Sequence, residues 1–323
     1  MAVPAAQCDA LVIGAGVSGL TTAVCLAEAG LAVVVRAEDP PERTTSAAAG
    51  ALWTPHLVEE GERVVAWASR TLGELESLAG DPATGVRMVS GIEAARVQLT
   101  PPDWAGAVAG FRACRDGELP SGYRSGWWFT TPLVEMGVYL GYLARRLTAA
   151  GGAIEVAAVS SIADAAATVP AVVNCAGVGA RRLVPDPLVT PVRGQVVIVR
   201  NPGITEFFAD VAPASSETLY FLPHPATVVL GGTEEHGSFD LRPDPPTARR
   251  IQDRCAAVEP RLRGAEVIAH RVGLRPVRPQ IRLDAQRLPG GALLCHNYGH
   301  GGAGITLSWG CAREAAELII GEL

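Results

Sequence analysis

The sequence predicts an α/β fold, α+β overall, in which a doubly wound domain is interleaved with an antiparallel, β-rich domain. Three observations support this prediction. The chain opens with a strand, a glycine-rich turn, a helix and a second strand. Comparable buried strands return in the middle and at the end, and β-rich runs separated by Pro, Gly and Ser lie between these returns. A length of 323 residues accommodates two such domains.

The first element is a short buried strand over residues 9–13 (DALVI), and the glycine-rich turn GAGVSGL follows it at once. Apolar residues at helical spacing continue to Gly30, after which LAVVVRAE predicts a second strand. In a β-α-β unit of this kind, Gly14 makes the tight turn, Gly16 lets a pyrophosphate approach the backbone, and Gly19 lets the helix pack closely on the strand. The pattern therefore predicts a Rossmann-type, dinucleotide-binding domain.

The residue after the second strand indicates which dinucleotide is bound. An acidic side chain that binds the ribose hydroxyls is expected about 20 residues after the glycines. Glu38 stands there, with Asp39 beside it. A carboxylate would repel a ribose phosphate, so the sequence disfavours NADP.

The middle of the chain alternates between helix and strand patterns. Residues 136–150 predict an amphipathic helix, and AIEVAAV and PAVVNCAG predict two strands that return to the dinucleotide-binding sheet. The runs VRGQVVIVR, ETLYFL and ATVVLGGT instead predict an antiparallel sheet. We therefore expect a dinucleotide-binding domain and a substrate-binding domain, formed respectively by residues 1–55, 136–190 and 268–323, and by residues 56–135 and 191–267.

A second glycine-rich loop, YGHGGAG, lies between the last predicted strand, GALLCHN, and a final helix. Apolar residues of that helix recur at helical spacing from Ile305 to Ile319. We expect this loop to place a second helix N-terminus over the same cofactor. The partial positive charge of a helix N-terminus would stabilise a ring that becomes an anion on reduction, which favours a flavin over a nicotinamide.

Composition disfavours several classes of function. The net charge is −6, the sequence pI is near 5.6 and basic residues are not clustered, which argues against nucleic-acid binding. No apolar run reaches the ~18 residues that span a bilayer, and no basic flank precedes the first apolar stretch. We therefore expect a cytoplasmic protein that binds no membrane.

Cysteine and lysine usage narrows the chemistry further. Seven scattered cysteines without a C-x-x-C pair predict neither disulfides nor a metal site. All 27 cationic side chains are arginine, which excludes a lysine Schiff base.

Seven phrases spread over almost the whole chain are VIGAGVSGL, TTSAAAG, VVNCAG, VRGQ, VVLGGT, VGLRPVRPQIRL and HNYGHGGAGITLSWGCA. In this order they resemble the D-amino-acid oxidase and D-aspartate oxidase family of FAD enzymes. The resemblance implies a Rossmann-type FAD-binding domain with an interleaved antiparallel β-rich substrate domain. It also implies oxidative deamination of D-amino acids by hydride transfer from Cα to the flavin. Dioxygen would then reoxidise the flavin to give hydrogen peroxide, and the imino acid would hydrolyse to a 2-oxo acid and ammonia.

The resemblance assigns substrate-binding roles to three residues. Arg275, in GLRPVRP, would hold the substrate carboxylate as a bidentate pair. The hydroxyl of Tyr220 would hold the same carboxylate, and the backbone carbonyl of Gly302 would accept a hydrogen bond from the amine. Mammalian D-amino-acid oxidases carry a second tyrosine four residues before Tyr220, where this chain has Ser216, which implies a shorter or more open lid. His56 is expected to lie behind the substrate contacts.

The resemblance also assigns residues to FAD, which we expect to be bound without a covalent link. The expected residues are Gly14, Ala15, Gly16, Val17, Ser18, Gly19 and Glu38 on the ADP half, Thr44, Thr45, Ala49 and Gly50 on the diphosphate and flavin, Val159 on the adenine, and Gly301, Gly304, Ile305 and Thr306 on the edge of the isoalloxazine ring.

Three alternatives stay open. A D-aspartate oxidase would need a second cation near the lid, and residues 201–241 contain no Arg or Lys, which favours neutral, mostly apolar D-amino acids. A glycine- or sarcosine-type amino acid oxidase would share the fold. A non-enzymatic flavin-binding protein would share only the cofactor, because a fold alone does not confer activity. The oligomeric state is also open, with a homodimer as one alternative.

Overall fold

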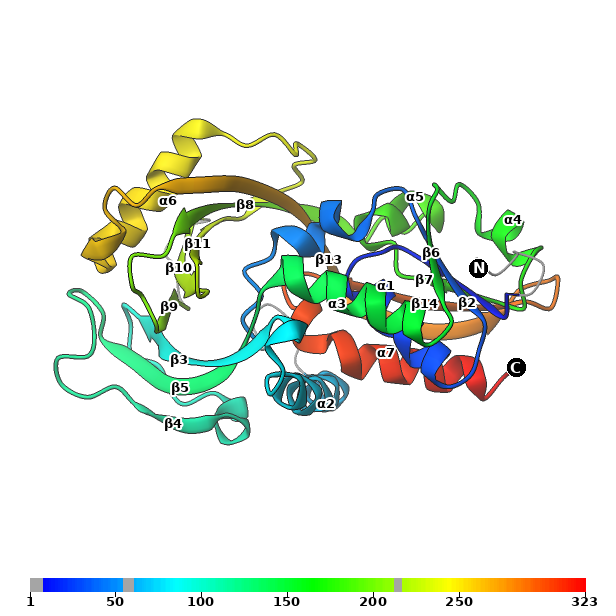
Figure 1. Ribbon diagram of the computed structural model, residues 1–323, viewed down its shortest axis with the longest axis horizontal. Coiled ribbons are helices and arrows are strands. Elements are labelled where there is room, and N and C mark those ends of the chain that lie inside the picture. The colour runs from blue at the N-terminus through cyan, green and yellow to red at the C-terminus, as the bar shows by residue number, and fades with distance from the viewer. Residues whose placement is uncertain (1–7, 55–60, 212–216) are drawn as a thin grey trace.

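The computed structural model describes residues 8–54, 61–211 and 217–323. Within these ranges one 14-stranded sheet crosses the whole molecule, with a parallel half and a mainly antiparallel half (Figure 1). Helices cover the sheet in both halves. The predicted fold class, α/β and α+β overall, is confirmed.

The parallel half contains the strands predicted at the beginning, in the middle and at the end of the chain. Their order is β14-β7-β1-β2-β6, and every neighbouring pair is parallel. Short, continuous apolar runs form such strands because both faces of the sheet are buried. The strands are β1 (Ala10–Ile13), β2 (Val33–Ala37), β6 (Ala153–Val156), β7 (Ala171–Asn174) and β14 (Leu293–His300).

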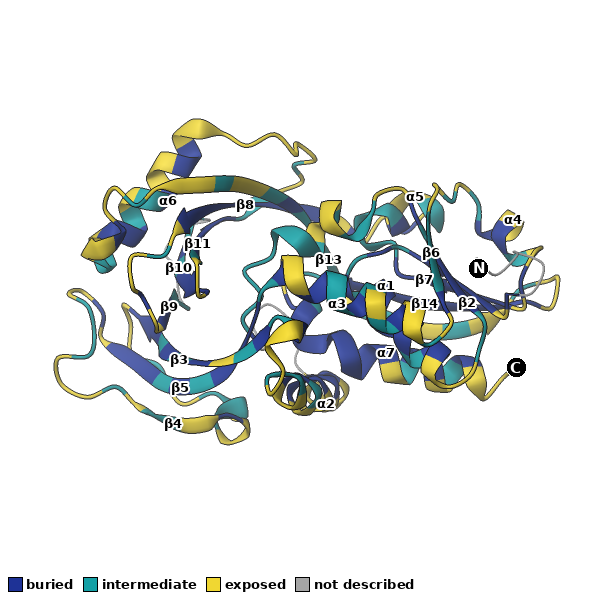
Figure 2. Ribbon diagram, viewed as in Figure 1, coloured by how far each residue is buried: buried dark blue, intermediate teal, exposed yellow. Residues whose placement is uncertain are grey.

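Helices pack on both faces of the parallel half, and the strands between them are buried (Figure 2). On one face, Ala10 and Val12 of β1 lie in a large apolar cluster with α1, α3 and α7. On the other face, Leu11 and Ile13 pack in a second cluster with α4. The helices are α1 (Val17–Glu28), α3 (Met136–Ala149), α4 (Ile162–Ala166), α5 (Ala180–Leu183) and α7 (Gly304–Ile320).

A further helix, α2 (Glu62–Leu78), packs against α7. The two helices touch at Gly310, where a Cβ atom would lie only 2.3 Å from the Cα atom of Trp67. The glycine therefore permits a contact that a side chain would prevent.

The antiparallel half has the order β4-β5-β3-β9-β10-β11-β8, and β12 pairs with β8 outside this path. All its pairs are antiparallel except β3 with β9, which the sequence did not predict. The strands are β3 (Val86–Ala95), β4 (Ala109–Ala113), β5 (Ser125–Val134), β8 (Thr190–Arg200), β9 (Phe207–Asp210), β10 (Glu217–Pro223), β11 (Thr227–Thr233) and β12 (Glu235–His236).

One face of this half is covered by α6 (Pro245–Val258). The helix begins at Pro245 because Asp244 caps it: the Asp244 carboxylate accepts a hydrogen bond from the backbone N–H of Thr247 at 2.9 Å. Ile251 and Cys255 of α6 then pack on the strands. The opposite face of the strands is left to line a cavity.

The two halves are joined by β13 (Val267–Arg287), a strand of 21 residues. Its first part pairs with β8 of the antiparallel half, and its second part pairs with β14 of the parallel half. The predicted boundary at residues 267 and 268 falls at the start of this shared strand. The division into two domains stays a prediction.

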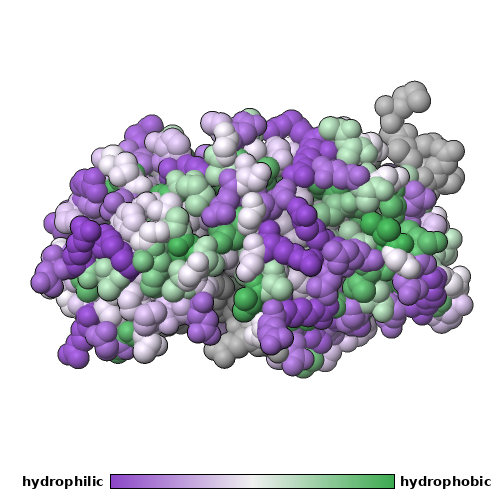
Figure 3. All heavy atoms as spheres, turned by 90° about the horizontal axis from the view of Figure 1, so that it is seen from below, coloured by the Kyte–Doolittle hydropathy of each residue, from purple (hydrophilic) through white to green (hydrophobic). Residues whose placement is uncertain are grey.

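The surface mixes polar and apolar residues. Figure 3 shows one face, on which hydrophilic side chains are interspersed with smaller apolar areas. Over the ranges that the structure describes, no helix combines the length and the hydropathy that a bilayer crossing requires.

Candidate active site

A cavity of about 1110 Å³ is lined by residues of both halves. The parallel half contributes the loops that follow β1, β7 and β14. The antiparallel half contributes one face of β8 and β10. The carboxyl ends of parallel strands are the usual place for a bound nucleotide in such folds.

The first glycine loop forms one wall of the cavity. Gly14 has a φ of 108°, and a Cβ atom there would lie 2.5 Å from the carbonyl oxygen of Cys175. A Cβ atom at Gly19 would lie 1.8 Å from the carbonyl oxygen of Gly14. Because no side chain fits at either position, α1 starts directly behind the loop, and Val17 and Ser18 of its first turn line the cavity.

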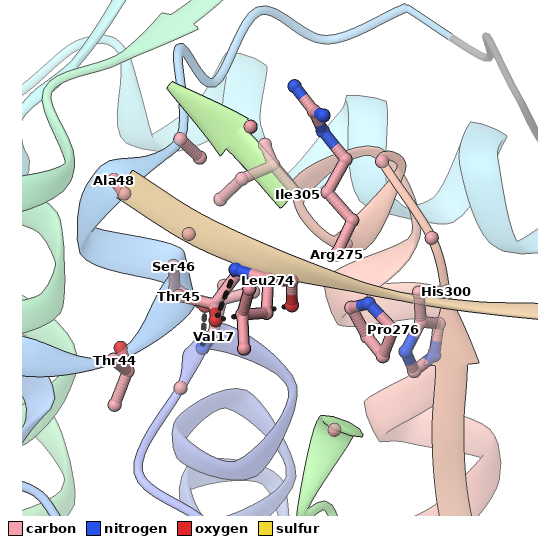
Figure 4. A pocket seen from close by; sticks show the side chains of 18 of the residues that line it. Val17, Thr44, Thr45, Ser46, Ala48, Leu274, Arg275, Pro276, His300 and Ile305 are labelled. Atoms are coloured by element: carbon pink, nitrogen blue, oxygen red, sulfur yellow. Dashed lines mark hydrogen bonds between the residues drawn. The ribbon is translucent and has the colours of Figure 1, made fainter. Parts of the chain in front are cut away.

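The loop after β2, which contains Thr44 and Ser46, makes hydrogen bonds both to α1 and to the long strand β13. The hydroxyl oxygen of Ser46 accepts a hydrogen bond from the backbone N–H of Val17 at 2.9 Å. The hydroxyl of Thr45 exchanges hydrogen bonds of 3.3 Å with the backbone of Leu274 (Figure 4). These contacts fix the edge of the cavity between the two halves.

The second glycine loop brings another helix N-terminus to the same cavity. Helix α7 begins at Gly304, and both Gly304 and Ile305 line the wall. Two helix N-termini, those of α1 and α7, therefore present partial positive charge to one cavity.

Two buried polar side chains beside these termini have atoms without a partner. Neither the Oδ1 atom of Asn297 nor the Nε2 atom of His300 has a hydrogen-bond partner among the described residues, and both side chains line the cavity. The other ring nitrogen of His300 lies 3.4 Å from the Ser18 hydroxyl. Burial lowers the pKa of His300 to about 4, so its ring is neutral near pH 7. Such atoms fit a polar ligand that supplies the missing hydrogen bonds.

Charged residues also line this part of the wall. Glu38 follows β2, as predicted, and Arg43, Arg181 and Arg182 line the same cavity. Guanidinium groups are well suited to phosphate oxygens. The glycine loop, the two helix N-termini and these side chains together fit a large dinucleotide whose diphosphate is anionic.

Arg275, on β13, also lines the cavity, and its side chain points to the other side of that strand from Leu274 (Figure 4). Its Nη1 atom donates a hydrogen bond of 2.9 Å to the carbonyl oxygen of Thr233. The guanidinium lies against Gly194 of β8, where a Cβ atom would be 2.6 Å from Nη1 and 2.7 Å from Nη2. The neighbours of this glycine, Arg193 and Gln195, hydrogen-bond to residues 233–244 instead. Gly194 thus makes the space in which the Arg275 guanidinium lies.

Tyr220, on β10, lies close to the Arg275 guanidinium. Its ring covers Gly231 of the adjacent strand, where a Cβ atom would lie 1.8 Å from the ring. Burial raises the pKa of the Tyr220 phenol, and the charge of Arg275 opposes this rise. A protonated phenol and a guanidinium side by side form a donor pair for one carboxylate.

The region from residue 9 to residue 318 matches the family model described as FAD dependent oxidoreductase. The chain belongs to the FAD-dependent oxidoreductase family. It is 51% identical over 310 residues to the D-amino-acid oxidase of Rubrobacter xylanophilus, with 96% of this chain and 95% of the relative covered. It is 49% identical over 312 residues to the D-amino-acid oxidase of Streptomyces coelicolor, with 96% of each chain covered.

The fold agrees with a solved structure of glycine oxidase from Geobacillus kaustophilus. The TM-score is 0.82 at 21% identity, with 98% of this chain and 95% of that chain covered. Membership of the FAD-dependent family explains why two glycine loops face one cavity. The cofactor is FAD, as predicted.

The fold brings most of the predicted site residues together in the wall of the cavity described above. These are Gly14, Ala15, Gly16, Val17, Ser18, Glu38, Thr44, Thr45, Ala49, Gly50, Tyr220, Arg275, Gly301, Gly302, Gly304 and Ile305.

Three predicted cofactor residues do not line the cavity. The Cα atom of Gly19 faces the carbonyl of Gly14, so its role is helix packing. The side chain of Val159 packs against an apolar cluster behind the sheet. The Thr306 hydroxyl donates a hydrogen bond of 2.9 Å to the carbonyl oxygen of Thr54 and is buried. Ser216 and His56 lie outside the described residues.

The sequence-based prediction missed Ser46, Gly194 and Asn297, all of which line the cavity. A signal was present for Gly194, because an isolated glycine inside a strand pattern often marks the close approach of another group. Ser46 and Asn297 carry no comparable local signal, since their roles arise from contacts with α1.

Proposed function

We propose that this protein is a D-amino-acid oxidase that oxidises the Cα–N bond of its substrate to an imine. The observation that carries the proposal is the pairing of Arg275 with Tyr220 in the wall of a cavity that also contains both glycine loops. In the overall reaction, a D-amino acid, dioxygen and water are converted to a 2-oxo acid, ammonia and hydrogen peroxide. When bound, FAD supplies the hydride acceptor and transfers the electrons to dioxygen.

The residues of the chain bind and orient the substrate. The Arg275 guanidinium and the Tyr220 hydroxyl donate hydrogen bonds to the substrate carboxylate. The carbonyl of Gly302, in the loop before α7, accepts a hydrogen bond from the amine. Cα is held between these anchors, so its hydrogen is directed at one fixed point. Positioning of this kind accounts for a large part of the rate, and no side chain needs to remove a proton from Cα.

Selectivity for the D enantiomer follows from the same geometry. With the carboxylate and the amine fixed, exchanging the hydrogen and the side chain at Cα directs the side chain toward the cofactor. The reactive geometry is then lost, and no discriminating side chain is required.

The wall disfavours an acidic substrate such as D-aspartate. Among the described lining residues of β3, β8, β9, β10 and β11, none is an arginine, so these strands place no arginine beside Arg275 in the wall of the cavity. A second substrate carboxylate would lack a partner there. The proposed substrates are therefore D-amino acids without an acidic side chain, neutral ones in the first place.

The cofactor is proposed to be held without a covalent link. Cys175 is the cysteine among the described lining residues, and burial raises the pKa of its thiol. A thiol of this kind is a poor nucleophile because the reactive form is the thiolate.

The purified holoprotein should be bleached anaerobically by D-alanine and not by L-alanine. Replacing Arg275 by Ala should raise the KM for D-alanine at least 100-fold, because a charge-assisted bidentate contact is lost. Arg275→Lys should recover only part of the loss, since an ammonium group cannot form the planar pair.

The matched control is Arg287→Ala at the far end of the same strand, where the arginine pairs with Glu322 and is about half exposed. This variant should keep the parent KM. Equal bleaching by the two enantiomers would refute the proposed activity. A normal KM in Arg275→Ala would place the carboxylate elsewhere.

A further inference from the structure

The two proposed substrate anchors belong to different strand pairings. Arg275, the carboxylate anchor, lies in the part of β13 that pairs with β8, and this pairing ends at Val277. Gly302, the amine anchor, lies in the loop that follows β14. The backbone N–H of Gly301 donates a hydrogen bond of 2.9 Å to the carbonyl oxygen of Pro276. The distance between the two anchors therefore depends on how β13 meets β14.

The junction between β13 and β14 contains a bulge. On β13, residues 278–281 lie between Val277 and Arg282, two positions that are in register with β14. The partners of these positions, His300 and Tyr298, are separated by a single residue. Extra residues in one strand bend it and change the direction of the chain on either side. Because a bulge interrupts the ladder of backbone hydrogen bonds, other contacts must hold its shape.

The Asp186 carboxylate supplies these contacts. One of its oxygens accepts a hydrogen bond of 3.0 Å from Nε of Arg278, within the bulge, and one of 2.8 Å from the Tyr298 hydroxyl of β14. The other oxygen accepts a bond of 3.1 Å from the backbone N–H of Leu188. Arg282, at the far end of the bulge, donates a bond of 3.0 Å to the same Tyr298 hydroxyl. One carboxylate thus joins the bulge, β14 and the segment before β8.

Burial and charge make this junction specific. Asp186 is 6% exposed. Burial alone would raise the pKa of its carboxyl, but the hydrogen bonds from Tyr298 and Arg278 lower that pKa below its ordinary value. At neutral pH the group is therefore an ionised acceptor, and charge-assisted hydrogen bonds of this kind fix geometry well. Asp186 is not among the described lining residues of the cavity, so it acts on a substrate only through the anchors.

We propose that Asp186 is a positioning residue that sets the distance between Arg275 and Gly302, and with it the position of the substrate Cα. The proposal rests on the proposed D-amino-acid oxidase activity, which gives the two anchors their roles. Without the Asp186 contacts the bulge relaxes, and Gly302 shifts relative to Arg275. The pair of Arg275 and Tyr220 stays intact, because β10, β11, β8 and the first part of β13 are neighbouring strands.

D-Alanine and propionate test the proposal, because propionate is D-alanine without its amine. D-Alanine uses both anchors, whereas propionate needs only Arg275 and Tyr220. In Asp186→Asn, the rate of anaerobic flavin reduction by saturating D-alanine should fall about tenfold or more, since a small misplacement of the reacting atoms costs much of the rate. The Kd of propionate for the oxidised holoprotein, measured by calorimetry, should stay within about twofold of the parent value.

Glu118→Gln is the matched control. Glu118 also binds an arginine, Arg112, through two hydrogen bonds, and it is not among the described lining residues. The variant makes the same change in net charge as Asp186→Asn and should keep both parent values. A parent rate of flavin reduction in Asp186→Asn would overturn the proposal. A propionate Kd that rises in parallel with the loss of rate would also overturn it, because the carboxylate anchor would then be lost as well.

Arg278→Met decides the question if Asp186→Asn does not retain FAD. This variant removes one of the two side-chain donors to Asp186 and keeps an apolar stem in the bulge. The same division between a slower flavin reduction and an unchanged propionate Kd is expected, and an unchanged rate would overturn the proposal. Failure of D-alanine to reduce the flavin of the parent would instead refute the proposed function.

Discussion

The guanidinium of Arg275 occupies the space that a side chain at position 194 would fill. A Cβ atom there would lie within 2.7 Å of three atoms of the guanidinium, closer than real contacts allow. The obstructed atoms are the end of a flexible side chain, so an added methyl group would displace Arg275 rather than the strands. The small size of Gly194 thus serves substrate binding more than stability.

Gly194→Ala should therefore separate binding from folding. We expect the KM for D-alanine to rise about tenfold or more, because the displaced guanidinium no longer meets the carboxylate, while the thermal midpoint changes little. The control is Gly73→Ala in the exposed middle of α2, where a Cβ atom would meet nothing within 4 Å. That variant should keep the KM and gain up to about 1 kcal/mol of stability. An unchanged KM in Gly194→Ala would disprove this role of the glycine.

Local sequence was enough to predict some of these residues and insufficient for others. Gly14 and Gly16 were predictable because their function depends on a turn between adjacent elements. The space that Gly194 makes for Arg275 depends on two strands far apart in the sequence. The expected contact of Val159 with adenine was inferred from the family resemblance alone and stays a prediction; the side chain is partly buried against an apolar cluster.

At the scale of elements, one arginine connects four helices. Arg146 of α3 pairs with Glu28 of α1 at 2.6 Å and with Glu74 of α2 at 3.2 Å. Its guanidinium also lies 4.8 Å from the ring centre of Trp309 in α7. Ion pairs that are partly shielded and shared among several elements contribute more than isolated surface pairs.

Arg146→Met should lower the free energy of unfolding by about 1–3 kcal/mol, since two carboxylates lose a shared partner and one ring loses its cation. Urea unfolding followed by circular dichroism in saturating FAD would measure this loss. Arg200→Met provides the comparison, because Arg200 and Glu266 form an isolated pair with side chains 64% and 62% exposed. Arg200→Met should leave the midpoint of urea unfolding unchanged. If both variants lost the same free energy of unfolding, the sharing of Arg146 among several helices would contribute no extra stability.

The elements themselves were predicted unevenly. The β-α-β unit and α7 were predictable because helical and strand periodicity are visible within one short segment. The strand β13 was not recognised, since Pro276 and Pro279 interrupt its pattern and lack the N–H groups of a regular ladder. Its extended conformation depends on pairing with β8 and β14.

At the scale of the whole molecule, three histidines are buried in different regions. His224 follows β10, and His296 and His300 lie in β14. Burial lowers the pKa of each to about 4, with nearby arginines adding to the effect at His224 and His296. The unfolded chain binds protons at these positions near pH 6.5, whereas the folded chain does not. Stability is therefore full above pH 6.5 and declines as the pH falls toward 4.

When the pH is lowered from 7.5 to 5.5, each of these histidines should lower the free energy of unfolding by about 1 kcal/mol. Carboxylates contribute little in this interval because their ordinary pKa values lie lower. Unfolding of the holoprotein at the two pH values would measure the difference, and His224→Asn should reduce it by about one third. Stability that is equal at both pH values would show that the buried rings are not kept neutral.

The sheet order also determines when the protein can fold during its own synthesis. The strands β1, β2, β6 and β7 are complete once Asn174 has been made, but one edge of β7 pairs with β14, which starts at Leu293. At roughly 5–20 residues per second, the intervening 118 residues (175–292) take about 6–24 s to translate. Throughout that time an apolar strand edge is open to pairing with other nascent chains. A chain truncated before residue 293 would keep that edge permanently, so premature termination should yield aggregates rather than a smaller nucleotide-binding protein.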